Sequence, residues 1–115
     1  MTHEINGVQL DIDMGDVAFI ERYEKAFEKM EENEAKVPKT GATTDRAKAF
    51  VSIFYELFDD IFGEGTGNAI FDGKCNIRMC LDAYDDFLEI CKSQIDETNK
   101  SIAKKYSKYM SKNRK

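Results

Sequence analysis

Two pairs of adjacent carboxylates are the residues of this sequence that come closest to a catalytic set. Asp59 is followed by Asp60, and Asp85 is followed by Asp86. Two carboxylates that share a site hold a proton between them or bind a divalent cation. Neighbouring residues of a helix, however, point about 100° apart, and a shared site on one face needs spacings of three or four. We therefore interpret both pairs as solvated helix surface.

The cysteines and the histidine do not form a recognisable metal or nucleophile site. Cys75, Cys80 and Cys91 are spaced C-x4-C-x10-C, which is neither a zinc ribbon nor a redox CxxC motif. His3 is the single imidazole of the chain, so a nucleophile has no histidine partner elsewhere. We expect reduced thiols, no catalytic metal, no cofactor and no enzymatic activity.

Two further fragments resemble known ligand loops and fail on spacing. The run from Asp11 to Asp16 begins like a calcium loop but has Asp16 where the turn glycine is required. The glycine-rich run from Gly63 to Gly67 departs from GxGxxG, because Asn68 occupies the place of the last glycine. We interpret the second run as a helix end followed by a tight turn.

Length and charge limit the class of protein. A chain of 115 residues corresponds to one domain, residues 1–115, and contains no apolar stretch near the ~20 residues of a membrane span. No cleavable signal pattern is present either, so we expect a cytoplasmic protein without a membrane partner. Residues 1–99 hold 22 acidic and 10 basic side chains, whereas residues 100–115 hold 7 basic and no acidic ones. The chain is therefore strongly bipolar.

The elements that must position these residues follow from turn and periodicity signals. Asn6-Gly7 between alternating apolar residues predicts a β-hairpin within residues 1–13. Apolar steps of three and four predict helices over 16–36, from Thr43 or Thr44 as the cap to Gly63, and from 77 to about 110 after an Asn76 cap. A structured loop is expected between Gly63 and Gly73. The predicted fold is α+β, mostly α: an N-terminal hairpin, a helical core over 14–99 with three main helices, the last long and protruding, and a basic end over 100–115.

The expected core uses one face of each helix. It is listed as Val17, Ile20, Tyr23 and Phe27; Phe50, Phe54, Leu57 and Ile61; and Leu81, Tyr84 and Leu88. A second apolar face on the last helix exceeds what two partner helices cover, and together with the open hairpin edge it predicts a partner surface and self-association. The predicted partner-binding residues are Ile70, Phe71, Met79, Phe87 and Ile90.

The basic end offers a second interaction site. Lys104, Lys105 and Lys108 are positioned to meet phosphate or an acidic partner, although the acidic remainder of the chain argues against tight binding of nucleic acid. A plain alternative is a solvated tail whose cations favour the C-terminal end of a helix. The alternative function is accordingly a small cytosolic adaptor or regulatory domain that contacts nucleic acid through this end.

The order of these parts resembles a known family. The Ile5-Asn6-Gly7 hairpin is followed by the segments ERYEKA from Glu21, FDDIFGEGT from Phe58 and CLDAYDDF from Cys80. Together they resemble small tail assembly chaperones encoded in Gram-positive siphophage and prophage tail modules, over roughly residues 4–95. The resemblance implies a non-enzymatic helical protein that binds the tape measure protein and helps recruit tail tube subunits in the host cytoplasm, and that is absent from the mature virion. The lysine-rich extension after Lys100 has no counterpart in the family pattern.

Overall fold

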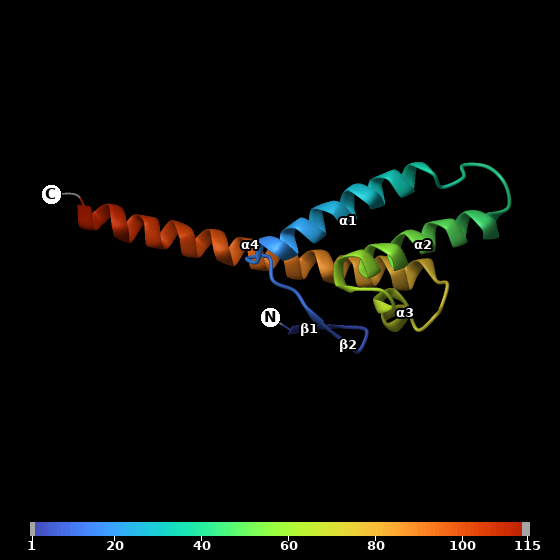
Figure 1. Ribbon diagram of the computed structural model, residues 1–115, viewed down its shortest axis with the longest axis horizontal. Coiled ribbons are helices and arrows are strands. Elements are labelled where there is room, and N and C mark those ends of the chain that lie inside the picture. The colour runs from blue at the N-terminus through green and yellow to red at the C-terminus, as the bar shows by residue number, and fades with distance from the viewer. Residues whose placement is uncertain (1, 114–115) are drawn as a thin grey trace.

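The computed structural model describes residues 2–113, with side chains as far as residue 108. Two strands and four helices follow one another: β1 (Thr2–Ile5), β2 (Val8–Asp11), α1 (Val17–Ala35), α2 (Thr43–Phe62), α3 (Thr66–Phe71) and α4 (Ile77–Asn113) (Figure 1). This arrangement confirms the predicted fold class, an N-terminal strand pair followed by helices of which the last is long.

The hairpin turns where the sequence predicts it. Asn6 and Gly7 have φ angles of 50° and 80°, the left-handed pair that a type I′ turn requires. The antiparallel register places Ile5 opposite Val8, so the turn contains two residues. Ile5 and Leu10 are both buried, and the hairpin therefore packs on the body through one face.

The helix ends agree with the expected signals except at the start of α2. The Asp16 carboxylate accepts the N–H of Ala18 at 3.1 Å and caps α1, and the N–H of Gly63 closes α2 on the Asp59 carbonyl at 2.8 Å. The predicted threonine cap of α2 is wrong. Ala42 holds the extended cap position without a side-chain bond, because Thr43 is already the first helical residue.

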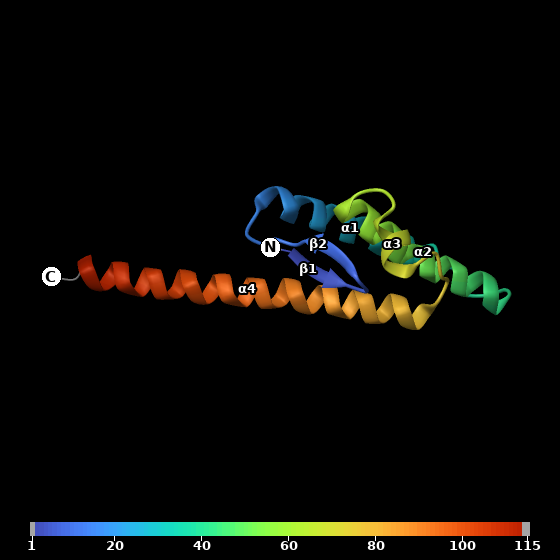
Figure 2. The same ribbon diagram turned by 90° about the horizontal axis from the view of Figure 1, so that it is seen from below.

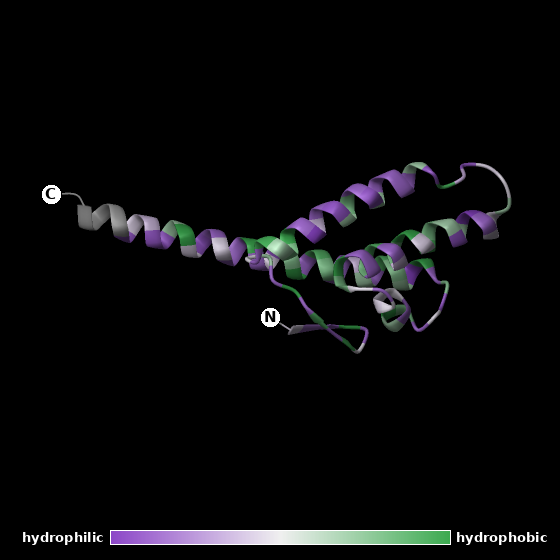
Figure 3. Cartoon of the chain, viewed as in Figure 1, coloured by the Kyte–Doolittle hydropathy of each residue, from purple (hydrophilic) through white to green (hydrophobic). Residues whose placement is uncertain are grey.

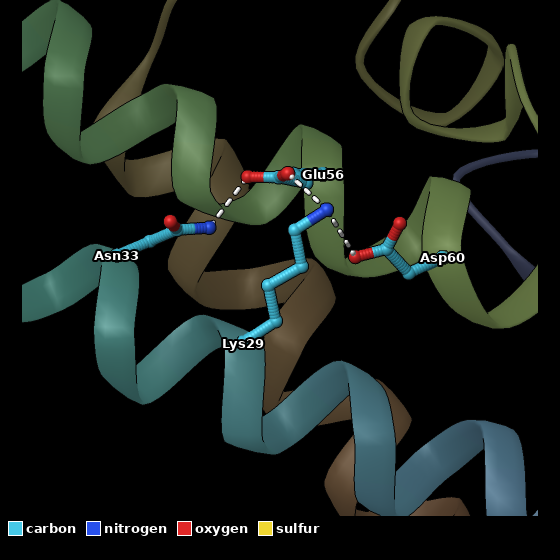
Figure 4. A network of polar contacts seen from close by, with 4 residues as sticks. All are labelled: Lys29, Asn33, Glu56 and Asp60. Atoms are coloured by element: carbon cyan, nitrogen blue, oxygen red, sulfur yellow. Dashed lines mark hydrogen bonds and ion pairs between the residues drawn. The ribbon is translucent and has the colours of Figure 1, made fainter.

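Helices α1 and α2 form an antiparallel pair joined by a polar network (Figure 4). Lys29 lies between two carboxylates of α2, 2.8 Å from Glu56 and 3.8 Å from Asp60. The Asn33 amide donates to the other oxygen of Glu56. Exposed ion pairs contribute little free energy, so this network fixes the register of the two helices more than it stabilises them.

The segment predicted as a loop contains the short helix α3. Its approach to α2 is close: a Cβ on Gly67 would lie 2.7 Å from the carbonyl oxygen and 2.8 Å from the Cα of Tyr55. The Asp59 carboxylate accepts the N–H of Gly67 at 2.7 Å. Asp59 is therefore more than solvated surface, since it anchors the start of α3.

Helix α4 confirms the prediction of a long final helix. Figure 2 shows all the other elements on one side of it. Its 37 residues correspond to about 55 Å. The chain measures 70 Å along its longest axis and has a radius of gyration of 18.2 Å, against about 13 Å for a compact domain of this size. Gln94 is the last buried residue of the described part, so α4 leaves the body earlier than residue 99.

Helices α1 and α4 bury a different face from the one expected from the sequence. Phe54, Leu57 and Ile61 of α2 are buried as predicted. Val17 and Leu81, however, are 67% and 41% exposed, so their assignment to the core was wrong. The buried positions are instead Phe19, Ala26 and Met30 on α1, and Cys80, Ala83, Phe87, Cys91 and Gln94 on α4.

Candidate partner-binding surface

Three of the predicted partner-binding residues belong to the core of the folded chain. Phe87 and Phe71 are completely buried, and Ile70 is nearly so. The Phe87 ring lies 5.7 Å from that of Phe58 and 5.8 Å from that of Phe62, both edge to face. These three side chains are not available to a partner while the chain is folded, which corrects the expected surface.

The reason is the size of the residues that face the body. Ala83 and the thiols of Cys80 and Cys91 are small and leave room on the buried face of α4 for the ring of Phe87. Larger apolar side chains such as Leu81 are displaced to the flank. Met79 and Ile90, the other two predicted residues, are half-buried and pack against the edge of the core.

The apolar surface that remains exposed runs along one side of α4. Its members are the exposed Leu81, Ile95, Ile102 and Tyr106 and the half-buried Leu88, here called the α4 stripe. At 100° per residue, all five point within about 60° of one another, and the stripe is turned roughly 90° from the buried face. Ile95, Ile102 and Tyr106 lie beyond or at the edge of the body and are 40%, 49% and 67% exposed. Figure 3 shows hydrophobic segments continuing along α4 outside the body.

A groove between α1 and α4 borders this stripe. It has a volume of about 480 Å³ and is lined by the apolar side chains Tyr23, Phe27, Met30 and Tyr84 and the carboxylates Glu24, Glu28, Glu31 and Glu34. The rings of Phe27 and Tyr84 lie 6.2 Å apart. Burial raises the pKa of the Tyr84 phenol, and the nearby Glu34 and Asp85 carboxylates raise it further. We call this feature the acidic groove.

The basic residues lie at the other end of the same helix. Lys104, Lys105 and Lys108 are all exposed on α4, beyond the body. Lys104 points about 160° away from Ile102, whereas Lys105 points only about 60° away. Lys108 follows Lys104 by four residues and shares its face, whereas Lys105 flanks the stripe.

Gln94 is the residue that sequence reasoning missed. Its Oε1 accepts the N–H of Met14 at 2.7 Å, its Nε2 donates to the Ile12 carbonyl at 2.8 Å, and Nε2 also lies 3.1 Å from Nε2 of His3. One amide side chain thus ties the exit of the hairpin to α4. The available signal was its place on the face of Phe87 and Cys91, seven and three residues earlier.

The chemistry-bearing residues take structural positions. Burial raises the pKa of the Cys80 thiol and that of the Cys91 thiol to about 11, which leaves both protonated at neutral pH. Cys75 is exposed. Within residues 2–113, no group of three or more His, Cys, Asp or Glu side chains is arranged to hold a metal ion. Among the described helices, none is both long and apolar enough to cross a membrane.

The fold and this surface define a class: a small, mostly helical α+β protein whose last helix extends an apolar stripe and a basic end beyond the body. The chain belongs to a family of unknown function, DUF6673, whose model matches residues 6–115. The match includes the whole of α4. No curated protein and no solved structure matches the chain.

Proposed function

We propose that this protein is a tail assembly chaperone that binds a long helical client, the tape measure protein, and helps recruit tail tube subunits to it. The observation that carries the proposal is the α4 stripe: apolar side chains of a helix that continues beyond its own body. The resemblance of the hairpin, the helix end at Gly63 and the start of α4 to such chaperones supplies the identity of the client.

The stripe has the properties that a helical client requires. A client helix packs its apolar residues between those of the stripe, as one helix does in the groove of another. Leu81 to Ile102 spans 21 residues, about 31 Å, which offers several helical turns of contact. The acidic body keeps the protein in solution while these side chains are exposed.

This role places the protein in the cytoplasm of the host bacterium during assembly and outside the finished virion. It needs no cofactor and no catalytic group. In this proposal the client surface consists of the stripe with the half-buried Met79 and Ile90 at its edge, and Ile70, Phe71 and Phe87 support it from the core.

Co-expression with the tape measure protein and a pull-down in about 0.5 M salt tests the proposal, because apolar contacts persist under conditions that weaken phosphate contacts by orders of magnitude. Wild type should retain the client, and Ile95→Asp should lose it. Ser93→Asp is the matched control: Ser93 is exposed on the same helix but points about 160° away from Ile95. Circular dichroism should show both variants as helical as wild type.

Two results would contradict this role. Equal retention of the client by wild type and Ile95→Asp would exclude the stripe as its site. If no client is retained, and neutralising Lys104, Lys105 and Lys108 to glutamine abolishes tight binding to DNA or RNA, the adaptor function replaces the chaperone function.

A further inference from the structure

The acidic groove is formed by α1 and by Tyr84 of α4, and its charge is complementary to the basic end of α4. From Arg78 to Glu97, α4 carries six acidic and two basic side chains; from Thr98 to Asn113, it carries five basic and no acidic ones. Two copies of α4 in parallel would place like charge beside like charge. In an antiparallel pair centred between Leu88 and Ile95, residues 98–105 of each copy, which include Lys100, Lys104 and Lys105, lie beside residues 78–85 of the other, which include Asp82 and Asp85.

The apolar residues of the α4 stripe also suit an antiparallel pair. Leu81, Leu88, Ile95 and Ile102 are spaced by seven residues, the repeat that keeps a seam of side chains facing a partner helix. In an antiparallel pair centred between Leu88 and Ile95, Leu81 faces Ile102 of the second copy and Leu88 faces Ile95. The same contacts are repeated about a two-fold axis, which closes the assembly at two chains.

The acidic groove lies where the partner's basic end would run. Tyr84 lines the groove and stands 18 residues before Ile102, five full helical turns, so the two share one face of α4. A helix packed on that face has α1 on its flank. On that flank, α1 presents Glu24, Glu28 and Glu31 at steps of four and three. They face the side of the partner helix on which Lys105 projects.

We propose that the protein forms an antiparallel two-fold dimer in which the basic end of α4 from each copy lies on the α4 stripe and in the acidic groove of the other. The contact covers the exposed side chains of Ile95, Ile102 and Tyr106 and brings Lys105 to the glutamates of α1. This surface differs from the hairpin edge, and it forms without a client, so its test is independent of the chaperone function.

Light scattering of the full chain after gel filtration, at high micromolar concentration and low salt, should give twice the chain mass of 13.2 kDa. Ile102→Asp should give the monomer mass, since it places a carboxylate in the apolar seam on both sides of the axis. Ile102 packs outside the core, so the helical content of this variant should be unchanged.

Charge reversal identifies the groove as the site. Lys105→Glu should weaken the dimer roughly tenfold or more, because each reversal counts twice about a two-fold axis. Lys104→Glu makes the same change of net charge one residue earlier, on the face turned away from the stripe, and should leave the dissociation constant within about twofold. Glu28→Lys/Glu31→Lys should weaken the homodimer in the same way as Lys105→Glu.

Mixing the two weakened variants is the decisive experiment for the dimer. Equal amounts of Lys105→Glu and Glu28→Lys/Glu31→Lys should form a mixed dimer more tightly than either variant forms its own. A monomeric wild type, an unchanged dimer of Ile102→Asp, an equal effect of Lys104→Glu and Lys105→Glu, or failure of the mixture to recover would each overturn the proposal.

Discussion

Replacing Gln94 by leucine should loosen the hairpin from α4 and cost the fold about 1 to 4 kcal/mol. The amide of Gln94 satisfies the Ile12 carbonyl and the Met14 N–H at 2.8 and 2.7 Å. Each group left without a partner costs about 1 to 3 kcal/mol, the upper part of that range applying to Ile12, which is fully buried. Leucine fills nearly the same volume, and its burial returns about 1.5 kcal/mol.

Urea unfolding followed by circular dichroism at 222 nm measures this change. The Gln94→Leu midpoint should fall without a change in slope, since the slope reports the surface exposed on unfolding. Gln9→Leu is the control: Gln9 is exposed on β2 and should change stability by less than about 0.5 kcal/mol. Hydrogen exchange should in addition show lost protection at the Met14 amide. A Gln94→Leu midpoint equal to that of the control would refute the role assigned to this amide.

Three further predictions concern the packing of α3 and the thiols. Gly67→Ala should destabilise the chain by roughly 1 to 3 kcal/mol in thermal unfolding, although alanine is the better helix former by about 1 kcal/mol, because the added Cβ meets the backbone of Tyr55; a stabilised variant would contradict the close approach. An aromatic disulfide reagent at pH 8 should titrate Cys75 alone in the native chain and release Cys80 and Cys91 only in denaturant, whereas three equally fast thiols would contradict their burial. These two thiols should leave the free energy of unfolding unchanged below about pH 9 and lower it as the pH rises towards 11. The reason is that the thiols ionise near pH 9.0 in the unfolded chain and near 11 in the folded one, so the unfolded state loses its protons first. Urea midpoints measured between pH 9 and 11 should therefore fall.

The element order was predictable from local signals. Asn6-Gly7 determines a two-residue turn almost by itself, because few other pairs adopt left-handed φ angles at both positions. Gly63 and Asn76 mark helix ends by backbone conformation and by capping, and these also act within a few residues. Each of these signals is complete within one short segment, so no knowledge of the tertiary fold is needed to interpret it.

The face that α4 buries was not predictable in the same way. A scale of hydrophobicity favours Leu81 and Leu88 over Cys80 and Ala83, yet Cys80 and Ala83 are fully buried while Leu81 is 41% exposed and Leu88 is half-buried. The buried face lies where small residues surround the one large ring of Phe87, and leucines lie on the flank. Periodicity predicts that the helix has two apolar faces. Which of the two is buried depends on the shapes of the elements that pack against it.

The cost of exposing the stripe is a reason to expect that it is covered. Ile102 and Tyr106 lie beyond Gln94, the last buried residue of the described part of α4, and Ile95 lies directly after it; none of the three belongs to the core. In the two proposals a second copy and a client helix use the same side chains, so they would compete for one surface, and the ligand present in excess or of higher affinity would occupy it. The dimer would then protect the stripe before the client is made, and the client would have to exceed the dimer's affinity to displace it. Reversing the charge of Lys105 should distinguish the two proposed contacts: it should weaken the dimer through the α1 glutamates and leave an apolar client interface intact in high salt.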